Sequence, residues 1–321
     1  MRSTLIVAVP MAVVLVTACA GNGGMGGGGG GGGGGGSSPG KTPMPFTSFS
    51  AVRFDQPVQA TGMSQTVSAT KTAVLGGVNI TSTTVNLVDT ASSSAQLTYG
   101  TLPAITAFSF GTPQSNVSFS GINVQCVAGT GVCSGSNTPT VASVTNALDA
   151  TVAWNYQSFG YWLAFPSTTT ALAGAISFGN ATPVASIPVS GTATYHGLSS
   201  GSYVDQTGAV FVHAAQMQSI VDFGPARSVV FSTSNTTISP LNATSPTAFP
   251  ALNLSGSLTI NTGANQFIGA VNAPGGGSTP AMTGTVTGRF YGPTAQEIGG
   301  VFSLKGTGPQ TMLGGFGGKQ P

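Results

Sequence analysis

Charged side chains are almost absent from this chain: Asp, Glu, Lys and Arg make up 4% of its 321 residues, against roughly 25% in an ordinary soluble domain. Long surface helices carry a charged outer face, so this composition argues against them. Eight Lys and Arg against six Asp and Glu give a net charge of +2, which excludes the basic surface that nucleic-acid binding requires. The 49 Gly, 20 Pro and many Thr, Ser and Asn favour strands joined by tight turns, and a hydrophobic fraction of 40% is enough for a core.

The amino-terminal residues have the pattern of an export signal. Arg2 is followed by an apolar run over 5–16, which is too short to cross ~30 Å of hydrocarbon but suits a signal-peptide core. The run ends in Val-Thr-Ala-Cys at 16–19, which resembles the lipobox of bacterial lipoproteins. We therefore predict a signal peptide over 1–18 and acylation of Cys19, with Ala20 favouring the outer membrane by analogy with that family. An ordinary secretory signal and a transmembrane anchor are the alternatives.

A glycine-rich segment over 19–45 follows the predicted acylation site, with unbroken glycine from 26 to 36. Such a segment buries nothing and has a large backbone entropy to lose, so we expect a disordered tether. Roughly 26 residues of this kind reach about 28 Å. A phosphate-binding loop is the alternative, but it would need a preceding strand and a following helix with a Lys.

The next part, 46–187, is predicted to be a β-rich handle domain. Its short β-branched runs are bounded by Gly, Pro, Asn and Ser, as in sandwiches and barrels. The clearest predicted strands lie at 83–88, 96–99 and 116–119, and a short helix is predicted over 142–149.

Two cysteines remain after the predicted processing. Cys126 and Cys133 have six residues between them, and a close pair in an exported protein favours a disulfide across a tight loop. A zinc site would need two further ligands, and none lies nearby in the sequence.

The last part, 188–318, is predicted to be a small eight-stranded antiparallel barrel. Eight strands are about the number that closes into a barrel filled by its own side chains, and closure removes exposed edges. A turn is expected over 197–201. The predicted strands are 191–195, 209–213, 219–223, 228–231, 252–260, 266–271, 283–291 and 300–304.

Three motifs in this half resemble a known family. Residues 288–302, GRFYGPTAQEIGGVF, resemble the G-x-F-Y-G-P-x-A-x-E-x-G-G-x-F signature of the barrel in transferrin-binding protein B-like surface lipoproteins. Residues 188–195 resemble the P-x-S-G-T-A-x-Y entry into that barrel, and 159–162 resemble the aromatic Y-G-x-W strand of the preceding handle domain. The resemblance covers about 154–318, and residues 46–150 show no alignable motif.

The resemblance implies a lipid-anchored binding protein at the outer membrane, on the cell surface or the periplasmic face. Its partner would be a protein or a small solute, captured for iron or haem acquisition, although transferrin binding itself is doubtful because the chain has length for only one lobe. We name Tyr161, Trp162, His196 and His213 as candidate ligand-binding residues, the two histidines because haem carriers occur among relatives of this barrel. A structural envelope lipoprotein without a specific ligand is the alternative.

Catalytic groups are scarce in the sequence. With two His, five Asp and one Glu, no serine-hydrolase elbow and no paired carboxylates can be assigned, so we expect no enzyme activity, no metal and no cofactor; hydrolysis is a weaker alternative. Glu297 is interpreted as a structural cap or a bridge to Arg289, with a catalytic carboxylate as the alternative. The aromatic residues Trp154 and Tyr156, placed on one face by alternation, are expected to pack between handle and barrel, with a partner contact as the alternative.

Overall fold

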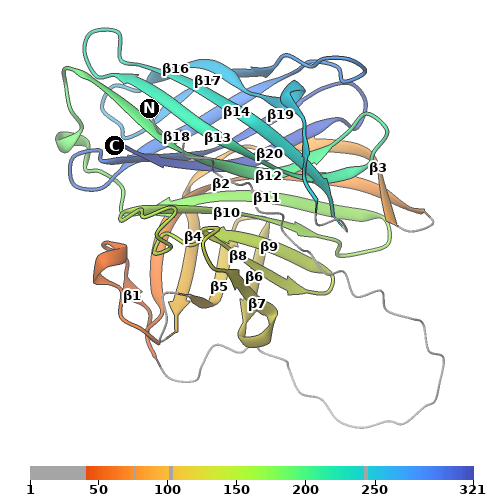
Figure 1. Ribbon diagram of the computed structural model, residues 1–321, viewed down its shortest axis with the longest axis horizontal. Coiled ribbons are helices and arrows are strands. Elements are labelled where there is room, and N and C mark those ends of the chain that lie inside the picture. The colour runs from red at the N-terminus through yellow and green to blue at the C-terminus, as the bar shows by residue number, and fades with distance from the viewer. Residues whose placement is uncertain (1–40, 75–76, 101–103, 242–244) are drawn as a thin grey trace.

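The structure is a computed structural model that describes residues 41–321 apart from 75–76, 101–103 and 242–244. Two β-sheets are stacked on each other (Figure 1), and the described residues contain short 3₁₀ turns but no α-helix. The predicted all-β fold is confirmed. The predicted signal peptide, Cys19 and most of the tether lie outside the described residues.

The amino-terminal sheet, which we call the handle, has eleven strands in the order β6-β5-β4-β2-β11-β10-β9-β8-β7, with β1 and β3 beside β2. Its hydrophobic core is formed by Phe108, Phe110, Trp162, Ile176 and Phe178 together with smaller side chains. The strands are β1 Met44–Pro45, β2 Val58–Val74, β3 Gly77–Val85, β4 Asp89–Tyr99, β5 Ile105–Thr112, β6 Ser115–Ser120, β7 Val124–Val127, β8 Val132–Asn137, β9 Thr140–Thr145, β10 Gln157–Ala164 and β11 Thr170–Gly179.

The predicted helix over 142–149 is wrong. Its first residues belong to β9, which pairs with β8 and β10, and turns follow. Val144 is fully buried in the handle core, so tertiary burial of this β-branched strand decides the local structure.

One bent segment brings the two edges of the handle sheet together. β6 pairs with β5 and β7 pairs with β8, and only the 3₁₀ turn η2, Gly121–Asn123, separates β6 from β7. Gly121 has φ +58 at this bend, a conformation that favours glycine. The same run of chain thus forms both edges of the sheet, which is nearly a closed barrel.

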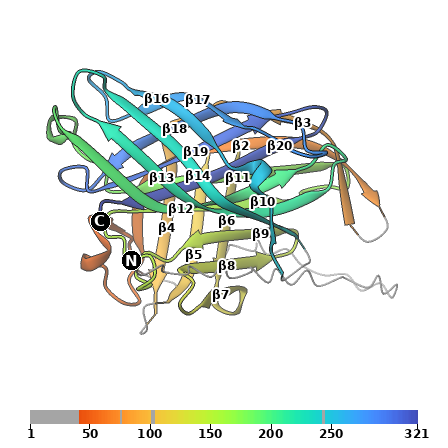
Figure 2. The same ribbon diagram turned by 45° about the horizontal axis from the view of Figure 1, so that its top comes forward.

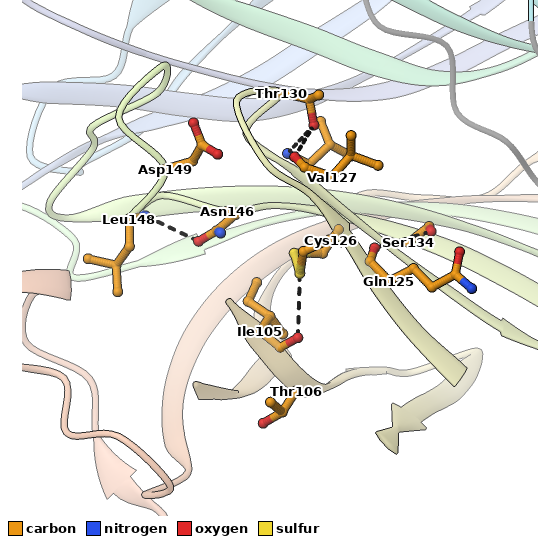
Figure 3. The surroundings of a disulfide bond; sticks show 12 residues. Ile105, Thr106, Gln125, Cys126, Val127, Thr130, Ser134, Asn146, Leu148 and Asp149 are labelled. Atoms are coloured by element: carbon orange, nitrogen blue, oxygen red, sulfur yellow. Dashed lines mark hydrogen bonds between the residues drawn. A yellow bond between two sulfur atoms is a disulfide. The ribbon is translucent and has the colours of Figure 1, made fainter. Parts of the chain in front are cut away.

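The predicted disulfide is confirmed and lies in this closing segment. Cys126 on β7 and Cys133 on β8 are register partners and are joined by a disulfide. Cys126 Sγ also lies 3.4 Å from the carbonyl oxygen of Ile105 on β5 (Figure 3). The bond therefore fixes β7 to β8 at the place where β7 passes the other edge of the sheet.

The carboxy-terminal sheet is the predicted eight-stranded barrel. The order β13-β12-β20-β19-β18-β17-β16-β14 closes through pairing of β13 with β14, and the two-residue β15 lies beside β14. The strands are β12 Thr192–Val204, β13 Val210–Asp222, β14 Ser228–Pro240, β15 Thr247–Ala248, β16 Ser255–Ile260, β17 Phe267–Ala273, β18 Met282–Tyr291, β19 Glu297–Lys305 and β20 Thr311–Lys319. The connecting segment 180–191 contains the predicted domain boundary, whose position stays a prediction.

The predicted number of barrel strands is right, but the structure differs from the prediction in three places. The runs 209–213 and 219–223 form one strand, β13, while β20 was not predicted at all. The expected turn over 197–201 lies inside the continuous strand β12. Glycine misleads here because an added Cβ at Gly197 would collide with the backbone of Gly317 on β20, so this glycine permits a close approach of strands and not a turn.

Aromatic side chains fill the barrel. Phe231, Phe267, Phe290, Phe302 and Phe316 are fully buried in one cluster. The rings of Phe231 and Phe316 are 4.9 Å apart and those of Phe267 and Phe290 are 5.5 Å apart, which is the usual spacing of packed aromatic pairs. The barrel interior is therefore a core and not a lumen for a ligand.

We predict that the disulfide stabilises the handle and not the barrel. Replacing Cys126 and Cys133 by Ala should lower the free energy of unfolding of the handle by about 2 kcal/mol, because the unfolded loop is no longer closed. Hydrogen exchange followed by mass spectrometry should show faster exchange in β5–β8 and unchanged exchange in β16–β18. Equal acceleration in both sheets would contradict this assignment.

Candidate functional site: the seam between handle and barrel

The four candidate ligand-binding residues do not converge. Trp162 lies in the handle core, Tyr161 lies between the two sheets, and His213 lies against Phe302 inside the barrel, all three at 4% exposure or less. His196 is exposed on the outside of β12, the strand that continues through the turn expected over 197–201. The two histidines thus lie on opposite sides of the barrel wall and cannot share a ligand.

The aromatic residues before and within β10 mainly build the cores. Trp162 is 5.8 Å from Phe110, and its indole occupies the space over Gly174 that a Cβ would fill. Trp154 packs 5.9 Å from Phe159 in the handle core, whereas Tyr156 lies over Gly292 of the barrel. The expected common face of Trp154 and Tyr156 is wrong because residues 153–156 are not a strand.

A buried polar contact joins the two sheets at Glu297. This first residue of β19 is 4% exposed, and its carboxylate accepts hydrogen bonds from three consecutive backbone N–H groups. Asn155 N lies 2.6 Å from Oε1, and the nitrogens of Tyr156 and Gln157 each lie 2.9 Å from Oε2. Burial raises the pKa of the Glu297 carboxyl, while these donors and Lys319 oppose the rise. Glu297 therefore caps the start of β10, and the structural interpretation agrees with its surroundings.

The predicted bridge from Glu297 to Arg289 is wrong. Glu297 pairs with Tyr291 across the β18–β19 hairpin, and the Arg289 guanidinium donates instead to the carbonyl of Thr90, with Nη2 and O 2.8 Å apart. The cation beside Glu297 is Lys319, its register partner on β20. Lys319 Nζ donates to the carbonyl of Ala153 at 2.9 Å, so it too links the barrel to the segment before β10.

Other residues of the 288–302 signature also contact the handle. The hydroxyls of Tyr291 and Ser177 are 2.9 Å apart, and an added Cβ at Gly299 would lie 2.8 Å from Ser177 Oγ. Gly292, at φ +87, donates its N–H to Asn180 O at 2.8 Å, and Thr182 Oγ1 donates to Gly292 O at 2.7 Å. The signature is thus a set of docking contacts for β11 and the segment after it.

An apolar layer continues from Glu297 along the seam, the contact of β2, β10 and β11 with β12, β19 and β20 (Figures 1 and 2). Glycine on β20 allows close stacking, since an added Cβ at Gly315 would lie 2.9 Å from the ring of Phe159. The buried side chains of this layer are Met63, Val67, Tyr161, Ala175, Val212, Val301 and Leu313.

At its other end the seam is held by the β2–β3 hairpin. Ile80 N donates to Gly208 O at 2.9 Å, and the hydroxyls of Thr83 and Thr311 are 2.5 Å apart. A cavity of about 30 Å³ lies here between Val67, Leu163 and Leu313. It has room for water-sized molecules, whereas small-ligand pockets measure roughly 300–1,000 Å³.

We also searched the described residues for metal-binding clusters and for helices that could span a membrane. They contain no cluster of three or more His, Cys, Asp or Glu side chains placed to hold a metal ion. Within residues 41–321, outside the three short gaps, none of the helices has the length and apolar character that crossing a bilayer requires.

Comparison with known proteins identifies the barrel. Residues 187–320 match the domain family described as C-lobe and N-lobe beta barrels of Tf-binding protein B. The resemblance predicted from the 288–302 signature is therefore confirmed for the barrel residues. The match is to a binding protein, which agrees with the expectation of a non-enzymatic role. No curated protein matches the chain.

Several solved structures are similar to the chain. Transferrin-binding protein B of Haemophilus parasuis Hp5, a mutant form, is 16% identical with a TM-score of 0.41, over 71% of this chain and 53% of that one. The isotype 1 protein of serogroup B Neisseria meningitidis is 16% identical with a TM-score of 0.41, over 75% and 53%. A mutant protein of Actinobacillus pleuropneumoniae H49 is 14% identical with a TM-score of 0.43, over 81% and 100%. The chain spans about half the length of the first two, and identities this low place no constraint on its ligand.

We predict that Glu297 stabilises the docked arrangement. Glu297→Ala should lower the free energy of unfolding by about 3 kcal/mol, because three buried or partly buried N–H groups lose a charged acceptor. Glu297→Gln keeps one acceptor oxygen and should cost less. Chemical denaturation measures the loss, and hydrogen exchange should show accelerated exchange of the amides of 155–157. Slow exchange of these amides in Glu297→Ala would contradict the cap.

His213 should make the barrel less stable in acid. Its Nε2 lies 3.2 Å from Leu313 O, its Nδ1 has no partner, and burial lowers its pKa to about 4. The unfolded chain, with a His pKa of about 6.5, binds the proton more readily, so this contribution is complete above about pH 6.5 and declines as the pH falls toward 4.

Between pH 7 and pH 5 the expected loss is about 2 kcal/mol, measured as the difference between wild type and His213→Phe in denaturant titrations. Glu297, whose pKa is raised, changes stability in the opposite sense and is common to both proteins, so the subtraction isolates His213. Parallel pH profiles for the two proteins would show that His213 does not titrate between the folded and unfolded states.

Proposed function

We propose that this chain is a lipid-anchored binding protein of the cell envelope that captures a protein partner on the outside of its barrel. The observation that carries the proposal is the filled interior: a barrel of a binding-protein family is packed by its own phenylalanines and leaves the ligand only external surfaces.

The anchor is the acylated Cys19, which would attach the chain to the outer membrane through the glycine-rich segment. The Val-Thr-Ala-Cys sequence at 16–19 and the apolar run before it support this part of the proposal. More than one acyl chain, as lipoproteins normally carry, is sufficient for stable attachment.

A protein partner fits the geometry better than haem or another small solute. The cavity at the seam is far smaller than a ligand pocket, and His196 and His213 lie on opposite sides of the barrel wall. A receptor for iron or haem would therefore act through the iron-carrying protein and not through a pocket of its own.

The barrel face opposite the handle is the best surface for such a partner (Figure 1). Ile220 on β13 lies directly opposite Val230 on β14, and Ile268 lies two strands further on β17. We call these three side chains, which are 45%, 50% and 42% exposed, the barrel apolar set. Strands β14, β16 and β17 carry no charged residue, and interface centres are depleted of charge.

The face can be tested by capture experiments with the full Cys19→Ser chain immobilised through its amino terminus. We expect a discrete protein from serum or culture medium to be retained, and retention to fall at least tenfold when the barrel apolar set is changed to Ser. Haem titration should leave the absorbance band of free haem unchanged. Absence of any retained protein would favour the alternative, a structural envelope lipoprotein without a specific ligand.

A further inference from the structure

A second group of exposed apolar side chains lies at the opposite end of the molecule. Phe54, Ile122 and Val127 are 53%, 95% and 53% exposed, and we call them the distal apolar set. The barrel is contacted by β2, β10 and β11, whereas β5–β8 lie on the far side of the handle (Figures 1 and 2), and Figure 1 places β1 and β7 at this far end.

Hydrogen bonds connect this set to Lys41, the first described residue. Lys41 Nζ donates to Asp55 O at 2.8 Å, next to Phe54, and Asp55 N donates to Tyr99 O at 2.6 Å. Tyr99 is the last residue of β4, and the next strand, β5, begins at Ile105. The carbonyl oxygen of Ile105 lies 3.4 Å from Cys126 Sγ on β7. The first described residue and the distal apolar set therefore share one end of the handle.

We propose that this end of the handle rests on the phospholipid bilayer to which the chain is anchored, with the distal apolar set inserted at the headgroup level. The inference depends on the proposed anchor at Cys19. Twenty-one residues separate Cys19 from Lys41, and a glycine-rich segment of that length reaches about 26 Å. The surface nearest to the lipid is therefore the one around Lys41.

A weak apolar contact is sufficient in this arrangement. Attachment through a short linker raises the effective concentration of the attached surface to the order of millimolar, so three side chains need to add only a modest affinity. Lys41 and Arg53 are balanced by Asp55 and Asp149 at this end, so the contact should depend little on salt. Contact through this end would direct the barrel apolar set away from the membrane, toward a partner.

The test uses the full lipidated chain reconstituted in vesicles of phosphatidylethanolamine and phosphatidylglycerol that contain a nitroxide-headgroup lipid. A fluorophore is attached to Thr106→Cys, exposed on β5 beside the distal end (Figure 3), or to Thr259→Cys, exposed on β16 of the barrel face. We expect headgroup quenching at position 106 to exceed that at 259 severalfold, at low and high salt alike.

Changing Phe54, Ile122 and Val127 together to Ser should reduce quenching at 106 to the level seen at 259. The matched change of Ile220, Val230 and Ile268 to Ser should leave it unaltered, and equal melting temperatures would show that both variants fold. Equal quenching at the two positions, or quenching at 106 that survives the distal substitutions, would overturn the proposal. Quenching at 106 that falls as the protein concentration rises would also overturn the proposal, because it would show that a second copy of the chain covers this end.

Failure of the anchor is distinguishable from failure of the contact. If the wild-type chain does not float with vesicles, the lipid anchor at Cys19 is wrong. The same labels are then read on the chain held to the vesicles by an amino-terminal histidine tag and a nickel-chelating lipid. Loss of the difference between 106 and 259 in that setting would refute the membrane contact itself.

Discussion

The arrangement of the molecule depends on one buried carboxylate. Glu297 lies at the start of a barrel strand, and its carboxylate accepts hydrogen bonds from the three N–H groups that lead into β10 of the handle. Taking a carboxylate out of water is costly unless donors replace the water, and a carboxylate aligned with three amides satisfies this condition only when both sheets are in register. An apolar residue would fill the same space without selecting a register. The signature acid thus specifies how handle and barrel meet, and an apolar layer continues the contact beyond it.

Glycine has the complementary role on the barrel side. Gly299 and Gly315 face the handle, and each leaves room for a side chain of the opposing sheet, Gln157 or Ser177 in the first case and Phe159 in the second. Stacked sheets usually lie about 10 Å apart because side chains from both fill the gap. Where the barrel sheet has glycine, it contributes no side chain to the gap, so an aromatic ring of the handle packs directly against the barrel backbone. This explains why a strand as rich in glycine as β20 still packs closely against the handle.

The same glycines mark the limit of what the sequence could predict. Alternating runs such as 228–231 and 283–291 predicted their strands because each contains enough β-branched or aromatic residues. β20, with four glycines among nine residues, carries no such pattern, and its strand exists only because β12 and β19 pair with it on both sides. The disulfide could be predicted because its partners are close in the chain. The partners of Glu297 could not, because they lie 140–142 residues away and are backbone groups without a sequence signal.

The scarcity of charge and the packed interior restrict how this protein can recognise a ligand. A chain that buries its largest side chains in two cores and a seam has few groups left with which to recognise a ligand, and its strands β14, β16 and β17 offer only hydroxyl, amide and small apolar groups. Such a surface cannot select a partner by long-range electrostatics, which mainly accelerates association. Selection must come from shape and from apolar contact. Apolar contact is weak for a freely diffusing protein but effective for one held at a membrane, where the partner meets many copies in a fixed orientation. The barrel apolar set and the distal apolar set, on different parts of the molecule, supply apolar contacts of this kind.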